Sequence, residues 1–200
     1  MAAVSIFAPM NPDMIHDIIK KRKSYYPPQF LPKEIPREVI DELLKSANEA
    51  PTHKLTEPWR YKVITGPARK RFGEFMSEKY RAITPTPEFS IAKYEKIKTN
   101  PQKSGAVLAI CMQRDPNGRI PEWEELASVA MSVQNIWIAC SGYGIGAYWS
   151  SPDLIQYFGE FEKLSEGERC IGIFYMGYIG QEVPGPNKKP IEDKVVWINK

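Results

Sequence analysis

A short basic cluster near the N-terminus holds the first residues that could do chemistry. Lys20 to Lys23 (KKRK) ends a predicted helix, and Ser24 follows directly. Arginine presents a planar fork of N–H donors that matches a phosphate, and a lysine and a hydroxyl beside it can bind the same anion. Arg22, Lys23 and Ser24 therefore form a candidate phosphate site. The alternative is that these cations only complement the negative end of the helix dipole.

The segment Thr52 to Trp59 (THKLTEPW) is a second candidate site. It brings one of the two histidines, a lysine, a carboxylate and a tryptophan into eight residues between a predicted helix and a predicted strand. Loops carry binding and catalytic residues more often than core elements do. No catalytic triad is suggested by the spacing, and no metal-ligand spacing is found around the three cysteines.

A glycine-rich stretch, Gly142 to Ser151 (GYGIGAYWSS), is the third candidate. Glycine accepts positive φ and lets other groups approach the backbone closely. Ala147 to Trp149 is predicted as a short strand. A buried helix that leads through glycines to an aromatic edge is a suitable place for a flat ligand. The alternative is an ordinary helix end.

The element that we expect to position the candidate sites is a helix over Leu126 to Cys140, which leads directly into the glycine-rich stretch. Its apolar residues go right round the helical wheel, which predicts a helix buried on all sides, of about 18 residues or roughly 27 Å. The fully apolar part is shorter than the about 20 residues that a bilayer requires. Glu124 and Glu125 also argue against lipid, so we expect no membrane association.

The remaining elements follow from hydrophobic periodicity and turn signals. We expect a mobile, irregular segment over 84–102, with a short helix around 91–97. A lone C-terminal strand over 194–199 (KVVWIN) follows a proline-rich arm. Other predicted helices start at Asn11-Pro12 and cover 36–50, 67–80 and 151–158, and other predicted strands cover 60–65, 106–112 and 170–178.

Length and composition predict one domain over 1–200, with a C-terminal arm over 179–200 that could be exchanged with a partner subunit. The net charge of +3 is small and scattered, so we expect no nucleic-acid binding; a binder using Lys20 to Lys23 is a distant alternative. Met1 to Met10 does not read as a signal peptide. Cys111, Cys140 and Cys170 lie in apolar runs and are expected to be buried reduced thiols, which favours the cytoplasm.

Taken together in this order, the motifs resemble the FMN-dependent nitroreductases. Arg22-Lys23-Ser24 is similar to the family's R-R-S start, and Ala50 to Lys54 with Glu57-Pro58-Trp59 is similar to its A-P…Q-P-W loop. The His53-Lys54 pair is closest to the small bacterial NAD(P)H nitroreductases. Further similar motifs are Pro121, Trp123, Glu124, Gln134-Asn135, Gly144-Ile145-Gly146, Met176-Gly177-Tyr178 and Lys188-Lys189-Pro190.

This resemblance implies an α+β fold, in which a mixed or antiparallel sheet is wrapped by helices around a long buried central helix. It also implies a homodimer with FMN at each subunit interface. NADH or NADPH would reduce the flavin, and a nitro compound, a quinone or another small electron-poor acceptor would then reoxidise it in a ping-pong cycle. No catalytic side chain is expected, because the cofactor carries the chemistry. The alternatives are a dehydrogenase or enone reductase on the same fold, or a flavin-binding dimer without turnover.

The resemblance also assigns residues to the cofactor. The phosphate and ribityl chain would be held by Arg22, Lys23 and Ser24, with Lys188 as a basic phosphate ligand. The flavin ring would be approached by His53 and Lys54, from the same chain or from the partner, and flanked by Tyr148, Trp149 and Ser150. Three residues depart from the family pattern: Tyr26 replaces Arg or Lys, Leu55 replaces Asn, and Glu57 replaces Gln. A Glu57 carboxylate could accept from flavin N3–H, but it would repel the anionic reduced flavin.

Overall fold

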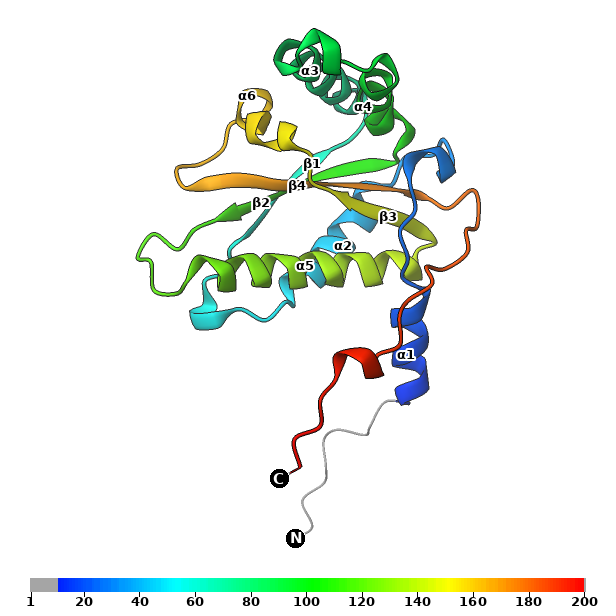
Figure 1. Cartoon of the computed structure of the whole chain (residues 1–200), viewed down its shortest axis with the longest axis vertical. Helices are drawn as coiled ribbons and strands as arrows, with labels where there is room; N and C mark the ends of the chain where they lie inside the picture. Colours follow the sequence, from blue (N-terminus) through cyan, green and yellow to red (C-terminus); the bar gives the residue numbers. More distant parts are fainter. Residues whose placement is uncertain (1–10, 200) are drawn as a thin grey trace.

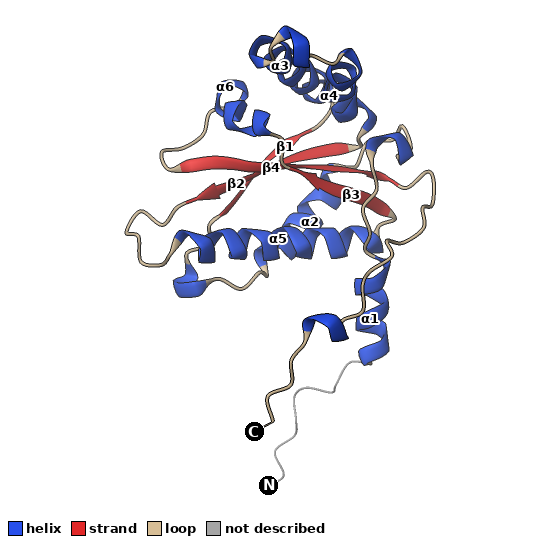
Figure 2. Cartoon of the chain, in the orientation of Figure 1, coloured by secondary structure: helices blue, strands red, loops and turns tan. Residues whose placement is uncertain are grey.

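The computed structural model describes residues 11–199 as one antiparallel sheet between two layers of helices (Figures 1 and 2). The strand order is β1-β2-β4-β3. Helices α2 and α5 cover one face, and α3, α4 and α6 cover the other. The expected α+β class is confirmed. The strands are β1 (Trp59–Ile64), β2 (Ala106–Gln113), β3 (Ile145–Ser150) and β4 (Glu168–Tyr178); the α-helices are α1 (Pro12–Lys21), α2 (Arg37–Asn48), α3 (Pro67–Ile83), α4 (Ile91–Lys103), α5 (Glu122–Gly142) and α6 (Phe158–Phe161).

Strand β2 lies in the interior of the sheet, and this position explains why the sequence of the strand is continuously apolar. Successive side chains of a strand point to opposite faces. Leu108 and Ile110 pack in the core beneath α2 and α5, whereas Val107 and Ala109 pack in the second core beneath α3 and α6. Because both faces are covered by helices, neither set of side chains can be polar. The prediction of a buried strand here is confirmed.

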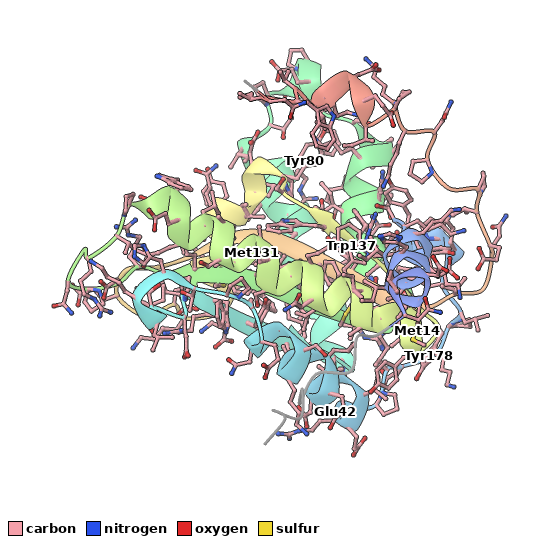
Figure 3. All side chains as sticks on the ribbon, turned by 90° about the horizontal axis from the view of Figure 1, so that it is seen from below. Met14, Glu42, Tyr80, Met131, Trp137 and Tyr178 are labelled. Atoms are coloured by element: carbon pink, nitrogen blue, oxygen red, sulfur yellow. The ribbon has the colours of Figure 1, made fainter. Side chains whose placement is uncertain are left out.

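Helix α5 is the long central helix, with 21 residues, but it is not buried on all sides. Val129, Val133 and Ile136 face the core. The opposite side carries an apolar stripe that is open in the single chain; we call it the open stripe of α5. Figure 3 looks onto this helix, with Met131 and Trp137 labelled. The open stripe comprises Trp123 (68% exposed), Leu126 (41%), Ala130 and Met131 (40%).

The segment over 84–102 is more regular than its sequence predicts. Ser90 accepts a hydrogen bond from the Lys93 N–H and starts α4, which runs to Lys103 and packs along α3. Tyr94 and Asn100 are buried. The helix predicted around 91–97 is present, but it is longer than predicted and continues to Lys103. Its extent was missed because lysines, a proline and Asn100 weaken the apolar pattern of the face that packs against α3.

The predicted strand over 194–199 is not formed. Glu192–Lys194 is a single 3-10 turn, Val195 is extended, and residues 195–199 belong to no helix or strand. Val196, Trp197 and Ile198 are 82–87% exposed. A strand needs hydrogen bonds from a neighbour, and nothing in the described part of this chain supplies them.

Another small correction concerns 151–158, where a 3-10 helix (Asp153–Tyr157) runs into α6 and the helix ends at Phe161.

No helix within residues 11–199 combines the length and the apolar character needed to cross a membrane.

Candidate functional site

The segment that follows α1 runs beside the outer edge of β3. Ser24 forms a parallel bridge with Ala147, and the Tyr25 N–H donates to the Ala147 carbonyl at 3.1 Å. Gly146 permits this approach, because a Cβ there would lie 2.6 Å from the Tyr25 Cβ. The basic cluster and the glycine-rich stretch, which lie more than 100 residues apart in sequence, therefore meet in the fold.

A basic hollow of about 830 Å³ opens on one side of this segment. Arg22 lies in it with its guanidinium 4.7 Å from the centre of the Trp137 ring. Lys188 of the arm lines the same hollow. The structure thus brings together the cations that the sequence analysis assigned to a phosphate. The hollow is lined mainly by Lys20, Lys21, Arg22, Lys23, Trp137 and Lys188, with Asp17 and Glu182 as its acids.

Lys23 already has a partner in this hollow. Its ammonium donates to Glu182 at 2.8 Å and to the Val183 carbonyl, and the Tyr25 hydroxyl donates to the same carboxylate at 2.9 Å. The hydrogen bond from Lys23 holds the pKa of the Glu182 carboxyl below its usual range. Lys23 and Glu182 therefore neutralise each other. Arg22 and Lys188 have no ion pair among residues 11–199 and remain available for an anion.

Trp137 also offers a donor without a partner. Its Nε1 atom is buried, and no acceptor in the described part of the chain receives its proton. A buried polar atom without a hydrogen bond costs about 1–3 kcal/mol. Trp137 also lines the basic hollow beneath Arg22, so this unsatisfied donor belongs to a residue of the hollow's wall.

An aromatic hollow of about 580 Å³ lies next to Tyr26, under α3 and α4. Tyr26 contacts Tyr148 with a centroid distance of 4.8 Å, and Tyr148 stacks on Tyr175 at 5.1 Å with an interplanar angle of 11°. Burial raises the pKa of both Tyr148 and Tyr175, so these walls stay uncharged near neutral pH. Ser150 lines the same hollow. Flat uncharged walls of this kind suit a planar ring.

The alternation of β3 divides the predicted Tyr148-Trp149-Ser150 run between two faces. Tyr148 and Ser150 face the aromatic hollow, while Trp149 packs with the core beneath α2 and α5. There it covers Gly172, where a Cβ would lie 1.9 Å from the Trp149 Nε1. Trp149 therefore supports the site from behind the strand.

Helix α4 contributes residues that the sequence analysis missed. Lys93, Lys96 and Asn100 line the aromatic hollow together with Ile97. They recur at three- and four-residue intervals, which is the spacing of one helix face. That spacing was visible in the sequence, but the expectation of an irregular segment concealed it. The two lysines have no ion pair within residues 11–199.

The loop with His53 lies elsewhere in the chain, against the first turn of α5. His53 Nδ1 is 2.5 Å from the Glu124 carboxylate, and the Lys54 ammonium donates to the Arg119 carbonyl at 3.1 Å. Lys54, Leu55 and Glu57 all have positive φ, at 52°, 53° and 41°. Such backbone strain in residues other than glycine is concentrated at functional sites.

The histidine loop and the basic hollow lie at opposite ends of α5. His53 binds Glu124 and Arg22 covers Trp137. These two positions are 13 residues apart on the helix, about 20 Å at 1.5 Å per residue. None of His53, Lys54 and Glu57 lines either hollow. In a single chain, the cations predicted for the phosphate and part of the predicted ring site therefore lie close together. The histidine loop is distant from both hollows.

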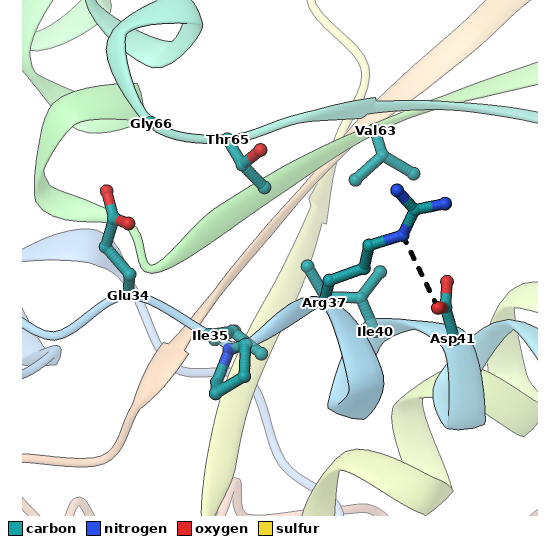
Figure 4. A pocket seen from close by; sticks show the side chains of 9 residues that line it. Glu34, Ile35, Arg37, Ile40, Asp41, Val63, Thr65 and Gly66 are labelled. Atoms are coloured by element: carbon teal, nitrogen blue, oxygen red, sulfur yellow. Dashed lines mark ion pairs between the residues drawn. The ribbon is translucent and has the colours of Figure 1, made fainter.

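A third hollow, of about 650 Å³, lies between the start of α2 and the outer edge of β1 (Figure 4). Ile35, Ile40 and Val63 form its apolar part, and an Arg37–Asp41 ion pair of 3.6 Å lies at its side. It contains none of the predicted site residues. No cluster of three or more His, Cys, Asp or Glu side chains that could hold a metal ion occurs between residues 11 and 199.

Comparison with known proteins gives one consistent result. The sequence profile of the Nitroreductase family matches residues 19–178. YfhC of Bacillus subtilis, provisionally named an NAD(P)H nitroreductase, is 27% identical over 192 residues, which is 90% of this chain and 92% of YfhC. YdjA of Escherichia coli K12, with the same provisional name, is 24% identical over 146 residues, 70% of this chain and 75% of YdjA.

Solved structures show the same fold. A nitroreductase-like family protein from Bacillus cereus superposes with a TM-score of 0.78 and 26% identity, covering 99% of this chain and 100% of that one. The FMN-dependent nitroreductase NfnB from Mycobacterium smegmatis, solved with NADPH, has a TM-score of 0.74 and 14% identity, covering 94% of this chain and 99% of that one.

Proposed function

The chain belongs to the nitroreductase family, and from this premise we propose that it is an FMN-dependent oxidoreductase. NADH or NADPH serves as electron donor, and a nitro compound, a quinone or a similar small molecule serves as acceptor. The observation that carries the proposal is the pair of hollows beside Tyr25-Tyr26, one basic and one aromatic. A cofactor with a phosphate at one end and a planar ring at the other requires these two environments.

The residues present fit FMN. Arg22 and Lys188 are cations without an ion-pair partner in the described chain, and the Trp137 Nε1–H is a donor that lacks an acceptor. Lys23 contributes less positive charge to the hollow than the sequence predicts, because its ammonium is paired with the Glu182 carboxylate. In this proposal the phosphate is bound by Arg22 and Lys188, which line the basic hollow, with Ser24 beside them on the segment that bridges to Ala147. No G-x-G-x-x-G motif is present for a dinucleotide pyrophosphate.

The aromatic hollow receives the flavin ring in this proposal. Bound FMN supplies the hydride chemistry, accepting two electrons from the nicotinamide and passing them to the acceptor. Tyr148 and Tyr26 provide flat contact surfaces, and Ser150 provides a hydroxyl at the end of the strand. Lys93 and Lys96 line the same hollow, together with the carboxylates of Glu88 and Asp153. The role of the protein is to bind and orient the ring and to exclude water from it.

The protein is a homodimer in this proposal, and the open stripe of α5 is the main support. Large apolar side chains in one exposed row mark an interaction surface. A two-fold axis across α5 places two copies of this helix antiparallel, with the same patch on both sides. The start of one helix then lies beside the end of the other. The partner subunit's His53 and the partner subunit's Lys54 thereby approach the basic hollow of the first chain.

The C-terminal arm supports the same assembly. Val196 to Ile198 are exposed, while the outer edge of β1 has no strand beside it within residues 11–199. We propose one domain over 1–200 whose arm, over 179–200, crosses to the β1 edge of the partner. The hollow of Figure 4 lies on that edge. The three described cysteines are free and buried, which supports a cytoplasmic location.

The test is to purify the native protein, release its flavin by heat and identify it chromatographically. We expect FMN, and oxidation of NADH or NADPH that depends on an added nitroaromatic or quinone. Sedimentation should show a dimer. Removing residues 185–200 should give a monomeric or aggregating protein without flavin. FAD as the only released flavin, or a full-length monomer that retains FMN, contradicts the proposal.

A further inference from the structure

We propose that Cys111 and Cys170 are a redox-modification site, which hydrogen peroxide converts into a reversible disulfide between β2 and β4. The two residues are directly opposite in the antiparallel ladder. Opposite residues of such a pair have Cα atoms about 4.5–5.5 Å apart. Disulfides span Cα separations of about 4.4–6.8 Å, a range that includes the spacing of a ladder pair.

A β-bulge puts the two side chains on the same face. From Ala106 to Ile110 the register is regular, and continuing it would place Ile171 opposite Cys111. The register shifts by one residue after Ile110, so that Cys170 becomes the partner. A bulge adds one residue to one strand and changes the direction of the following side chains. Both cysteines consequently lie in the core beneath α3 and α6, whereas Ile171 packs against the opposite core.

The two thiols interact and are unequal. Interaction with Cys111 lowers the pKa of Cys170, whose thiol donates to the Gly172 carbonyl at 3.5 Å, while interaction with Cys170, together with burial, raises the pKa of Cys111. Cys170 is 8% exposed and Cys111 is fully buried. Thiolate character and access both determine which cysteine reacts with peroxide. Cys170 is therefore the attacking residue and Cys111 the resolving residue.

The chemistry balances with peroxide as the oxidant. The Cys170 sulfur attacks one peroxide oxygen, the O–O bond breaks, and water leaves with the thiol proton, which produces a sulfenic acid. The Cys111 sulfur then attacks the Cys170 sulfur, the S–O bond breaks, and the second water leaves with the Cys111 proton. Two thiols lose two electrons in total, and one peroxide is reduced to two waters. An added dithiol reverses the reaction by thiol–disulfide exchange.

Cys140 is an internal control for this inference. It is fully buried like Cys111, but it lies on α5 in the other core, and its sulfur neighbour is the Met176 thioether at 4.0 Å. Burial raises its pKa to about 12. A thiol with no second thiol beside it cannot form an intrachain disulfide, so Cys140 should stay reduced.

The experiment treats the purified full-length protein with graded hydrogen peroxide, quenches it, and alkylates the denatured protein before mass spectrometry. We expect two of the three thiols to be lost, a peptide containing Cys111 linked to Cys170, and full recovery with dithiothreitol. Cys140→Ser should behave like the wild type, and Cys111→Ala and Cys170→Ala should abolish the cross-link. The oxidised wild type should also melt several degrees above its reduced form, because the link joins the two central strands.

Three results overturn the inference. All three cysteines could remain alkylatable after peroxide, the cross-link could involve Cys140, or oxidation could stop at a single sulfinic acid without a disulfide. The peptide map of the wild type decides among these even if a cysteine variant folds poorly. Flavin binding and turnover are not part of this readout, so it is independent of the proposed function.

Discussion

Two variants, Arg22→Ala and His53→Ala, test whether each cofactor site is assembled from two chains. In the structure Arg22 contacts Trp137 and His53 contacts Glu124, and these two residues of α5 are about 20 Å apart along the helix. In the proposed dimer, an antiparallel two-fold pair of α5 helices would place His53 of the partner subunit next to Arg22. Each site then needs Arg22 from one chain and the histidine loop from the other.

The expected effects of the single variants are large enough to measure. Arg22→Ala removes hydrogen bonds to a charged group, which are usually worth about 1.5–3 kcal/mol. This weakens FMN binding by roughly 10- to 150-fold, since about 1.4 kcal/mol corresponds to tenfold. His53→Ala should leave folding intact, because this side chain is on an exposed loop, and should impair turnover or flavin retention.

Mixing the two variants then distinguishes the arrangements. In a heterodimer of Arg22→Ala with His53→Ala, one site carries both substitutions and the other site carries neither. Purified heterodimer, isolated with two different affinity tags, should show about half the wild-type FMN content and NAD(P)H oxidation at limiting FMN. An unpurified equal mixture should show about a quarter, because half of its dimers are mixed.

The reciprocal heterodimer is the control. A chain carrying both substitutions, paired with a wild-type chain, has one defect in each site if the sites are shared. It should then be inactive, although it contains the same number of substitutions. If the first heterodimer is no more active than its parents and the second keeps half the activity, Arg22 and His53 belong to the same chain's site, and the two-chain reasoning is refuted.

Three further predictions concern single positions. Glu57→Gln should raise the midpoint potential of the bound flavin if the histidine loop of the partner subunit brings this carboxylate towards the ring, as the family resemblance implies, since the substitution removes a negative charge that disfavours the anionic reduced flavin. A redox titration against a reference dye checks this, and an unchanged or lower potential shows that the carboxylate does not act on the ring. Met131→Lys, on the open stripe of α5, should give monomers without FMN in sedimentation, whereas Glu38→Lys on exposed α2 surface should not. Hydrogen bonds from Arg119 lower the pKa of Asp115 to about 2, so its carboxylate stabilises the fold above pH about 4 and loses this effect as pH falls towards 2. Asp115→Asn should therefore be less stable than wild type at pH 7, with a gap in denaturant midpoint that closes near pH 2; a gap independent of pH would argue against this contact.

Local patterns were sufficient for most secondary-structure elements. The continuous apolar run of β2 identified a strand with both faces covered, because only such a strand can omit polar residues. Asn11 was predicted to cap the first helix, and its side chain does accept from the Asp13 N–H. The motifs around Arg22 and His53 also pointed to the nitroreductase family, whose profile matches most of the chain.

Local patterns failed where neighbours decide the outcome. The helix α4 was predicted as a short helix around 91–97, but it extends to Lys103, because the rest of its half-polar inner face is stabilised by contact with α3. The segment after Lys194 has strong strand propensity, but it is not a strand here, because pairing requires a neighbouring edge. The all-round apolar character of α5 indicates burial, but only the fold shows which row of its side chains stays open in a single chain.

The sequence by itself determined which residues could bind an anion or a flat ring, and where most of the helices and strands lie. Only the tertiary structure decided how these residues are grouped: Arg22 contacts Trp137, Lys93 and Lys96 line the same hollow as Tyr148, and His53 lies at the far end of α5. Hydrophobic periodicity is a property of a few neighbouring residues, whereas such meetings depend on strand register and packing between segments far apart in sequence. The single bulge after Ile110 shows this, because a shift of one residue opposite β2 replaces Ile171 with Cys170 as the partner of Cys111.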